Sequence, residues 1–296
     1  MKKNQPTYCP GQQMSDAEFE KLRLLIYGQC GIKLPPVKKV MLRSRLSKRL
    51  RVLGLENFTD YFNYLNTTEG QSEELQPMID VVTTNKTDFF REPHHFDYLR
   101  QEALPEIIKK QRYQGEKQIR IWSSACSTGE EPYTIAMEVN EFLESQGLNS
   151  NFQVMATDIC TDVLNKARLA IYRHNDVEPV PLPLRQKYLT RSKDPKCDQV
   201  RITPGLRTKV RFQSFNLIKD RFPFSEPMDI IFCRNVLIYF DRQTQEKVIN
   251  RLCSQLKNGG ILILGHSETI QQFHVPLQQI KATIYRKMAR MTKIGL

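Results

Sequence analysis

The sequence predicts an α/β protein in which a mostly parallel sheet follows an all-helical N-terminal region. Three observations lead to this prediction. From Phe96 onward, apolar strand-like runs alternate with helical patterns, which is typical of a parallel sheet. Residues 119–137 have the pattern of a buried strand, a glycine-bearing turn and a helix, and residues 152–158 form a second apolar run that ends in an acid. Residues 14–82 show helical spacing alone.

The N-terminal region opens with Ser15-Asp-Ala-Glu18, the pattern of a helix capping box. The helix that follows carries apolar residues on one face: Phe19, Leu22, Leu25 and Ile26. Pro35-Pro36 then begins a second helix. In this helix, leucines recur at helical spacing and are expected to face the core: Leu42, Leu46, Leu50 and Leu53.

The second helix also carries a basic stripe. Residues 21–55 contain ten Lys or Arg and no acid, in a chain with a net charge of +12. Four basic residues are expected to project together from a side other than that of the leucines: Lys38, Arg45, Lys48 and Arg49. Such a stripe is expected to meet an acidic partner, which can be nucleic acid, anionic lipid or a glutamate-rich protein. The alternative is a solvated helix face.

A linker-like segment, residues 83–93, separates the helical region from the sheet. Phe89 and Phe90 are expected to anchor this segment against a core. Asn85, Thr87 and Arg91 offer hydrogen-bonding groups beside it.

The turn after the first strand is the most informative feature. Gly129 can adopt backbone angles that other residues resist, and the end of such a strand is where an open α/β sheet binds a nucleotide-like ligand. Asp158, at the tip of the second strand, is placed to accept hydrogen bonds from ribose hydroxyls. Glu130 and Glu131 would repel a pyrophosphate, so a positively charged adenosine ligand such as S-adenosylmethionine fits better. The alternative is that both glutamates merely favour the helix N-terminus.

The remaining elements follow the same alternation. Strands are expected near 119–125, 152–158, 209–215, 228–234 and 260–265, with Asn258-Gly-Gly260 as a helix-to-strand turn and 277–287 as one or two closing strands. Prolines interrupt the pattern between about 174 and 207, where we expect a small β insertion that exceeds an ordinary connection.

The fourth strand ends in Arg234 and Asn235, on the ligand side of the sheet, and Tyr239 follows closely enough to wall a pocket. The alternative is that Arg234 pairs with a nearby acid and that Tyr239 packs structurally.

Composition limits the class of protein. With 40% hydrophobic and 26% charged residues, the 296-residue chain is typical of a folded protein, and no apolar run approaches the roughly 18 residues of a membrane span. The N-terminus lacks the apolar core of a secretory signal. Seven cysteines without a Cys-x-x-Cys pair argue against a disulfide framework or a zinc site. We therefore expect a cytoplasmic protein without a metal.

These segments together strongly resemble the chemotaxis receptor methyltransferases, the CheR family. Five pieces match in family order and span nearly the whole chain: residues 84–92, 125–133, 156–159 and 232–240, and Gly265-His-Ser-Glu268. The basic helix after Pro35-Pro36 matches as well.

The resemblance implies a helical domain joined to an S-adenosylmethionine-dependent, Rossmann-like methyltransferase domain. The expected division is a flexible N-terminus (1–13), the helical domain (14–83), a linker contributing to the cofactor site (84–95) and the methyltransferase domain (96–296), with the β-subdomain at about 174–207. It also implies that nine residues surround the cofactor: Asn85, Thr87, Arg91, Glu130, Asp158, Asn216, Leu217, Arg234 and Asn235.

The implied reaction converts glutamate side chains on the cytoplasmic helices of a chemoreceptor into γ-methyl esters, with S-adenosylhomocysteine as the other product. A glutamate carboxylate has a pKa of about 4.3 and needs no general base. Arg91 is expected to orient either the acceptor carboxylate or the carboxylate of the cofactor, and Tyr239 is expected to position the acceptor oxygen. The histidines of the matching segments, His94, His95 and His266, are expected to be structural. The implied partner of Lys38, Arg45, Lys48 and Arg49 is the acidic receptor bundle.

Other functions are also compatible with parts of this sequence pattern. A nucleic-acid methyltransferase would explain the basic stripe, but the fourth strand is followed by Arg-Asn-Val-Leu-Ile-Tyr rather than an Asn-Pro-Pro-Tyr type motif. A cofactor-binding sensor without activity is a second alternative, and the acidic first turn disfavours a nicotinamide dehydrogenase. Some family members hold a receptor C-terminal peptide with a glycine-bearing β-subdomain loop, whereas residues 191–200 contain no glycine. A monomer is the default expectation.

Overall fold

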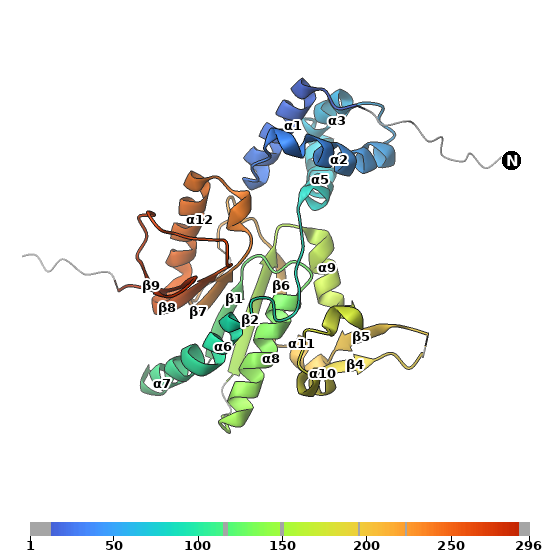
Figure 1. Ribbon diagram of the computed structural model, residues 1–296. Coiled ribbons are helices and arrows are strands. Elements are labelled where there is room, and N and C mark those ends of the chain that lie inside the picture. Colours follow the sequence, from blue (N-terminus) through green and yellow to red (C-terminus); the bar gives the residue numbers. More distant parts are fainter. Residues whose placement is uncertain (1–12, 115–117, 149–150, 195, 223, 290–296) are drawn as a thin grey trace, which may run out of the picture. The chain divides into compact units, whose positions relative to one another are not determined.

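The computed structural model describes residues 13–114, 118–148, 151–194, 196–222 and 224–289 (Figure 1). It divides between Thr84 and Asn85 into two compact units, which are described separately. The predicted flexible N-terminus, 1–13, lies outside the described residues except for Gln13.

The first unit consists of short helices: α1 (Asp16–Cys30), the 3-10 turn η1 (Pro36–Lys38), α2 (Lys39–Leu53), α3 (Phe58–Leu65), α4 (Thr68–Glu73) and α5 (Leu75–Val82). The predicted capping box is confirmed, because the Ser15 hydroxyl accepts the Glu18 amide and Glu18 accepts the Ser15 amide. Leu42, Leu46 and Leu50 are fully buried as predicted. Leu53, at the end of α2, is only partly buried.

A seven-stranded sheet with the order β6-β2-β1-β7-β8-β10-β9 forms the centre of the second unit. Its strands are β1 (Gln118–Ser123), β2 (Asn151–Asp158), β6 (Val210–Ser214), β7 (Met228–Cys233), β8 (Leu256–Leu264), β9 (Leu277–Lys281) and β10 (Ile284–Lys287). The first five of these pair in parallel, whereas β10 runs antiparallel to both β8 and β9. The predicted strands, including the closing pair, are therefore confirmed. The strand order reverses between β1 and β7, where open α/β sheets bind ligands.

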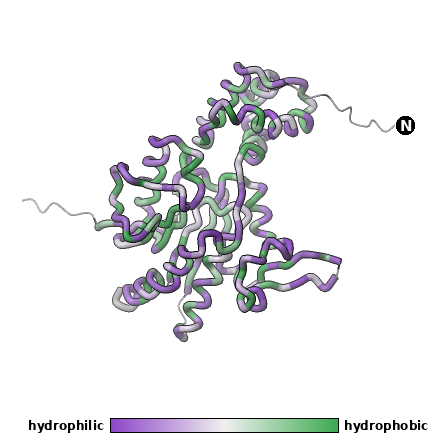
Figure 2. The backbone as a smooth tube through the Cα atoms, viewed as in Figure 1, coloured by the Kyte–Doolittle hydropathy of each residue, from purple (hydrophilic) through white to green (hydrophobic). Residues whose placement is uncertain are grey.

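Helices cover both faces of this sheet. The helical segments of the second unit are α6 (His94–Tyr98), η2 (Leu99–Ala103), α7 (Leu104–Gln114), α8 (Glu130–Ser145), α9 (Thr161–Leu169), η4 (Leu237–Tyr239) and α12 (Arg242–Gln255). Alternate residues of one strand enter different cores: Ile230 packs in a cluster with residues of α6, α7 and α8, and Ile231 packs with residues of α12. Figure 2 shows hydrophilic and hydrophobic residues alternating along the helices, as expected for helices with one buried face.

Two predicted boundaries differ from the structure. Asn258-Gly-Gly260 lies within β8 rather than in a turn before it, because α12 ends at Gln255 and the strand begins directly at Leu256. The β7–β8 register shifts between Met228 and Ile230, and Gly259 has φ +74°, so the glycines accommodate an irregularity inside the strand.

The inserted subdomain is a three-stranded antiparallel sheet with the order β3-β5-β4. It contains β3 (Ile171–Arg173), η3 (Asn175–Val177), α10 (Leu182–Tyr188), β4 (Leu189–Arg191) and β5 (Gln199–Ile202), followed by α11 (Pro204–Arg207). The first strand therefore begins before the predicted start at 174. Pro181 and Pro204 lie at helix N-termini, where the missing N–H costs nothing.

None of the helices within the described ranges combines the length and the apolar composition needed to cross a bilayer.

Candidate active site

The turn between β1 and α8 is held by the strands on both sides. The Ser124 amide donates to the Phe232 carbonyl at 2.9 Å, and the Cys126 amide donates to the Thr157 carbonyl at 2.9 Å. Gly129 has φ +98°, and a Cβ at this position would lie 3.0 Å from the Tyr172 hydroxyl. The predicted glycine-bearing turn is therefore confirmed, at the point where the strand order reverses.

Asp158 ends β2 beside this turn. One of its carboxylate oxygens accepts the Ser127 amide at 2.8 Å, and the other accepts the Cys160 amide at 2.9 Å. The structure thus fixes this carboxylate at the edge where ribose recognition requires it.

The two glutamates of the first helical turn have different surroundings. The Glu130 carboxylate is buried and accepts hydrogen bonds from the Thr128 hydroxyl at 2.9 and 2.7 Å. Burial raises the pKa of Glu130 to about 7, against the opposing effect of the Thr128 bond. In the described residues no cation forms an ion pair with Glu130, so a positively charged ligand group fits there.

Glu131 is already neutralised by the protein. It accepts the Ser123 hydroxyl at 2.7 Å and the Arg234 guanidinium at 2.9 Å. The same guanidinium lies 3.1 Å from Glu92 Oε2 and donates to the Arg91 carbonyl. With a side chain only 3% exposed, Arg234 links three segments of the chain, as the alternative reading of this arginine proposed. Its predicted contact with the cofactor stays a prediction.

Residues 85–93 lie against the first turn and α8. The Asn85 carbonyl accepts the Ser127 hydroxyl at 2.8 Å, and the Phe90 amide donates to the Thr134 hydroxyl at 3.3 Å. The Arg91 guanidinium donates to the carbonyl of Lys86 at 3.0 Å. Phe89 is buried, as predicted. The segment therefore carries the predicted residues Asn85, Thr87 and Arg91 to the same edge of the sheet.

The segment after β7 completes this edge. Asn235 has φ +57° and donates from Nδ2 to Glu92 Oε1 at 3.2 Å. Tyr239 ends the 3-10 helix η4 and is partly exposed. Within the described part of the chain, the structure records no hydrogen bond to the Tyr239 hydroxyl, so that hydroxyl is available to a substrate.

Asn216 and Leu217 follow β6, two strands away from β1 in the sheet. The Asn216 side chain accepts the Ile218 amide at 3.0 Å, and Leu217 is buried. The Arg251 guanidinium of α12 donates to the Ile218 and Asp220 carbonyls and so holds this loop in place.

Backbone strain is concentrated at this edge. Seven described residues other than glycine have positive φ, and four of them lie in the segments above: Phe90, Glu92, Ser127 and Asn235. Such conformations cost roughly 1–3 kcal/mol each and are concentrated at functional sites. This supports the carboxyl edge of the sheet as the active site.

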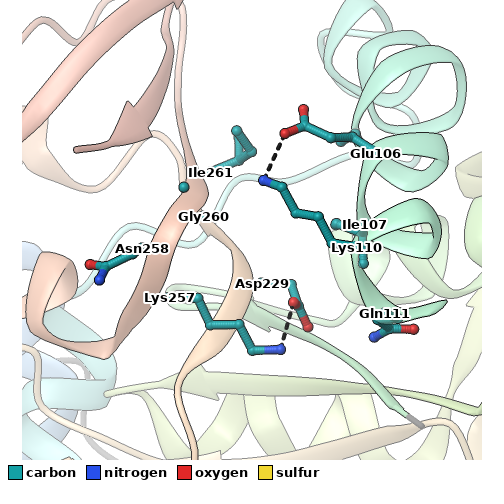
Figure 3. A pocket seen from close by; sticks show the side chains of 11 residues that line it. Glu106, Ile107, Lys110, Gln111, Asp229, Lys257, Asn258, Gly260 and Ile261 are labelled. Atoms are coloured by element: carbon teal, nitrogen blue, oxygen red, sulfur yellow. Dashed lines mark ion pairs between the residues drawn. The ribbon is translucent and has the colours of Figure 1, made fainter. Parts of the chain in front are cut away.

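The amino edge of the sheet contains a different cavity, of about 160 Å³, between α7 and the start of β8 (Figure 3). Lys110 pairs with Glu106 at 2.7 Å, and Lys257 pairs with Asp229 at 2.8 Å. Both lysines that line this cavity are paired with carboxylates, so neither is an unpaired cation that could bind a ligand.

In the helical unit, the predicted basic stripe is only partly free. Arg45 donates to the carbonyls of Val82 and Thr83, the latter at 2.8 Å. Arg49 binds Glu74 at 2.8 and 2.6 Å, and the Glu74 side chain is only 2% exposed. The prediction that these two arginines face outward is therefore wrong: both hold α5 against α2. The exposed basic residues of this helix and its first turn are Lys38, Lys48 and Arg51.

Sequence reasoning assigned no individual role to Glu92 and Glu268, although the structure pairs the first with Arg234 and buries the second. Glu92 and Glu268 each end a segment that matches the family, and this was the available signal. His95 is buried beside Thr283, and burial lowers its pKa to about 2, so the imidazole is neutral, consistent with a structural role.

The strand order and the acid at the tip of β2 define the class of S-adenosylmethionine-dependent methyltransferases. Comparison with known families gives the particular family. Residues 17–83 match the family described as "CheR methyltransferase, all-alpha domain", and residues 85–286 match "CheR methyltransferase, SAM binding domain". The chain belongs to the CheR methyltransferase family, and its cofactor is S-adenosyl-L-methionine.

The chain is similar in sequence to several chemotaxis protein methyltransferases over most of its length. A chemotaxis protein methyltransferase of Borreliella burgdorferi is 40% identical over 287 residues, which cover 97% of this chain and 100% of the relative. The Escherichia coli K12 protein of the same name is 40% identical, with 92% of this chain and 91% of the relative covered. The Salmonella typhimurium protein is 42% identical, with 86% and 84% covered.

Proposed function

We propose that this protein methylates glutamate side chains on the cytoplasmic helices of chemoreceptors and produces glutamate γ-methyl esters for chemotactic adaptation. The observation that carries the proposal is that three ionisable groups at the carboxyl edge are already engaged, while Glu130 is assigned to the cofactor. Asp158 holds backbone amides, Glu131 is paired with Arg234, and His95 is neutral and buried. With Glu130 assigned to the cofactor, the other three groups offer the acceptor no free base, which suits an acceptor that is already ionised at neutral pH, as a glutamate is.

When bound, S-adenosylmethionine supplies an electrophilic methyl group on a sulfonium. The buried carboxylate of Glu130 suits a cationic part of this ligand, and the fixed carboxylate of Asp158 suits its ribose hydroxyls. We propose that the remaining predicted residues line the same site: Asn85, Thr87, Arg91, Asn216, Leu217, Arg234 and Asn235.

The residues of this chain then act by orientation. Arg91 orients a carboxylate, and the Tyr239 hydroxyl positions the acceptor oxygen. Holding the reacting atoms in line is worth up to several kcal/mol of barrier, which is the form of catalysis open to a site without a base.

The partner proposed for the helical unit is the acidic cytoplasmic bundle of a chemoreceptor. Lys38, Lys48 and Arg51 are exposed on α2 and its first turn, with no acid between residues 21 and 55 to offset them. Relatives named chemotaxis protein methyltransferases support this partner. We further propose that the protein works in the cytoplasm as a monomer.

The test is methyl transfer from isotopically labelled S-adenosylmethionine to membranes containing chemoreceptors, followed by mild alkali. Label released as volatile methanol is expected, because carboxyl methyl esters hydrolyse under these conditions. Receptors whose methylated glutamates are replaced by alanine are the control and should accept no label. Alkali-stable label would instead indicate methylation of nitrogen or carbon.

The two proposed catalytic roles have their own test. Arg91→Ala and Tyr239→Phe should each lower kcat by about tenfold or more, since each removes a hydrogen-bonding group at the acceptor. Tyr285→Phe is a matched control, because Tyr285 is buried in β10 within the α12 core. Full turnover by either active-site variant would remove that residue from the mechanism.

A further inference from the structure

One carboxylate holds the backbone that follows β7. Glu268 lies beyond the end of β8 and is 5% exposed. Its Oε1 accepts the amides of Val236 at 2.9 Å and Leu237 at 2.7 Å. Its Oε2 accepts the amides of Asn235 at 2.9 Å and Gly265 at 2.7 Å. Three consecutive amides of one loop and a fourth from the neighbouring strand end therefore share a single charged acceptor.

Gly265 permits this close approach. A Cβ at position 265 would lie 2.1 Å from Asn235 Nδ2 and 2.9 Å from the Asn235 backbone nitrogen. Real side chains do not tolerate these distances, so any other residue would displace Asn235. The loop after β7 and the loop after β8 are thus fitted to each other both by hydrogen bonds and by shape.

The contacts continue from this loop into the active site. Asn235, held by Glu268 with φ +57°, donates to Glu92 Oε1 at 3.2 Å. Glu92 Oε2 in turn lies 3.1 Å from Arg234 Nη2. The amide of Leu237, bound by Glu268, begins the 3-10 turn that ends at Tyr239. The conformation of the segment that carries Asn235 and Tyr239 therefore depends on Glu268.

We propose that Glu268 is a positioning residue for methyl transfer, with Gly265 as its steric partner. Glu268 touches neither cofactor nor acceptor; it fixes the backbone of residues 235–239 so that Asn235 and the Tyr239 hydroxyl are presented to them. This inference rests on the proposed function, in which Tyr239 meets the acceptor and Asn235 meets the cofactor. A merely structural Glu268 would stabilise the fold without affecting this loop in particular.

Glu268→Gln is the sharpest variant, because it keeps the shape of the side chain. Glutamine presents one acceptor oxygen and one NH2 group, so in either orientation two of the four amides face a donor. Hydrogen exchange measured by mass spectrometry should be about tenfold faster or more in a peptide covering residues 234–240. In calorimetry, S-adenosylhomocysteine should bind about tenfold more weakly. This is the loss of affinity expected when one hydrogen bond to a charged group is lost.

Gly265→Ala is the second variant and serves where Glu268→Gln fails to fold. It leaves the carboxylate in place and displaces Asn235 sterically, so the same peptide and the same affinity should change. Asp229→Asn is the matched control. Asp229 is a buried carboxylate at the opposite end of β7, where it binds Lys257 at 2.8 Å and the Arg120 amide at 2.8 Å (Figure 3). This control should lower thermal stability but leave exchange in 234–240, cofactor affinity and turnover unchanged.

The outcomes separate the two proposals. Faster loop exchange in Glu268→Gln with unchanged affinity and unchanged kcat would overturn the positioning role, as would effects on exchange and affinity equal to those of Asp229→Asn. Failure of the wild-type protein to release methanol from receptors would contradict the proposed function instead. The exchange and S-adenosylhomocysteine measurements would still decide the role of Glu268, because neither requires a receptor.

Discussion

Glu130 and Glu131 are adjacent on the first turn of α8, yet their carboxylates have different partners. Glu131 is bound by Arg234, whereas the buried Glu130 carboxylate has only the Thr128 hydroxyl among the partners described for it. The sequence predicted an acidic first turn that favours a cationic ligand. Only the packing of Arg234 shows which of the two carboxylates already has a cationic partner within the protein.

The pKa of Glu130 predicts a pH dependence for cofactor binding. Burial, with a smaller contribution from the negative charges of Asp176 and Asp88, raises this pKa from 4.5 to about 7, against the lowering effect of the hydrogen bond from Thr128. Below pH 7 the carboxyl is mostly protonated and cannot pair with a cation. Affinity for S-adenosylhomocysteine should therefore increase from pH 6 to pH 8, by up to about tenfold per unit below the pKa, and level off above it.

Calorimetric titration at several pH values checks this prediction. Glu130→Gln should bind more weakly at pH 8 and lose the pH dependence between 6 and 8. Glu131 is unsuitable as a control because it binds Arg234. Glu138→Gln is used instead, since Glu138 lies on the same helix, two turns from the site. S-adenosylhomocysteine lacks the sulfonium and keeps the amino-acid ammonium group as its cation. A wild-type affinity that stays constant from pH 6 to pH 8 would therefore show that Glu130 does not meet this ammonium group.

At the scale of elements, the turn before α8 requires glycine at position 129, as both the sequence pattern and the structure indicate. Gly129 has φ +98° and would place a Cβ 3.0 Å from Ala167 Cβ and from the Tyr172 hydroxyl. Gly129→Ala should destabilise the protein by about 1–3 kcal/mol through strain and contact together, and should weaken cofactor binding. Gly147→Ala is the matched control, because φ is +59° there and nothing lies within 4 Å of the added Cβ.

Chemical denaturation with calorimetry separates the two effects. Gly147→Ala should cost only about 1 kcal/mol, the strain of a left-handed residue, and leave cofactor affinity unchanged. If both variants cost the same and bind the cofactor equally, close packing at Gly129 has no part in shaping the site.

In helix α2, the periodicity of the sequence predicts the buried face but not the partners of the basic side chains. The leucine spacing correctly predicted the buried face, because burial follows the helical repeat. The basic side chains share a neighbouring face, and periodicity does not say which of them meets an acid from elsewhere in the chain. Glu74, which pairs with Arg49, lies 25 residues away in sequence.

This arrangement predicts that substitutions at two neighbouring residues change stability by very different amounts. Arg49→Ala leaves the buried Glu74 without its cationic partner, with the Tyr61 hydroxyl still donating to it, and should destabilise the helical unit by about 3 kcal/mol. Lys48→Ala, on the exposed side, should change stability by less than about 0.5 kcal/mol. Hydrogen exchange in α5 peptides of the full chain measures the difference. Equal protection in the two variants would contradict the assignment of Arg49 as an internal partner.

At the scale of the whole molecule, sequence patterns predicted the strand alternation, the inserted β-subdomain and the ligand edge, because each depends on local residues and on the rule that ligands bind at the carboxyl ends of parallel strands. They did not predict the Glu92–Arg234–Glu131 contacts or the four amides on Glu268. Except for the bond from the Gly265 amide, these contacts join residues more than 30 positions apart in sequence, and Arg234 and Glu131 are 103 positions apart. Their geometry depends on the order of the strands in the sheet, and the local sequence pattern of one segment does not specify that order.

The net charge of +12 belongs to the whole chain, and its consequence is a prediction about the proposed partner. Because each methyl ester removes one negative charge from a receptor bundle, affinity for the receptor cytoplasmic fragment should fall as methylation proceeds. It should also fall between 50 and 300 mM salt, since screening shortens the reach of exposed charges to below about 10 Å. Binding of S-adenosylhomocysteine, which involves buried groups, should change little over the same range.

Receptor fragments with glutamate or glutamine at the methylation positions provide partners that differ only in charge. At low salt the glutamate form should bind more tightly, and the difference should shrink as salt is added. Replacing Lys38 and Lys48 together by alanine should reduce both the salt dependence and the preference, because these side chains are exposed. Replacing only Arg45, which is bound to backbone carbonyls, should leave the preference intact. Equal affinity for the two fragments at low salt would contradict an electrostatic docking surface on α2, whatever the outcome of the methanol assay.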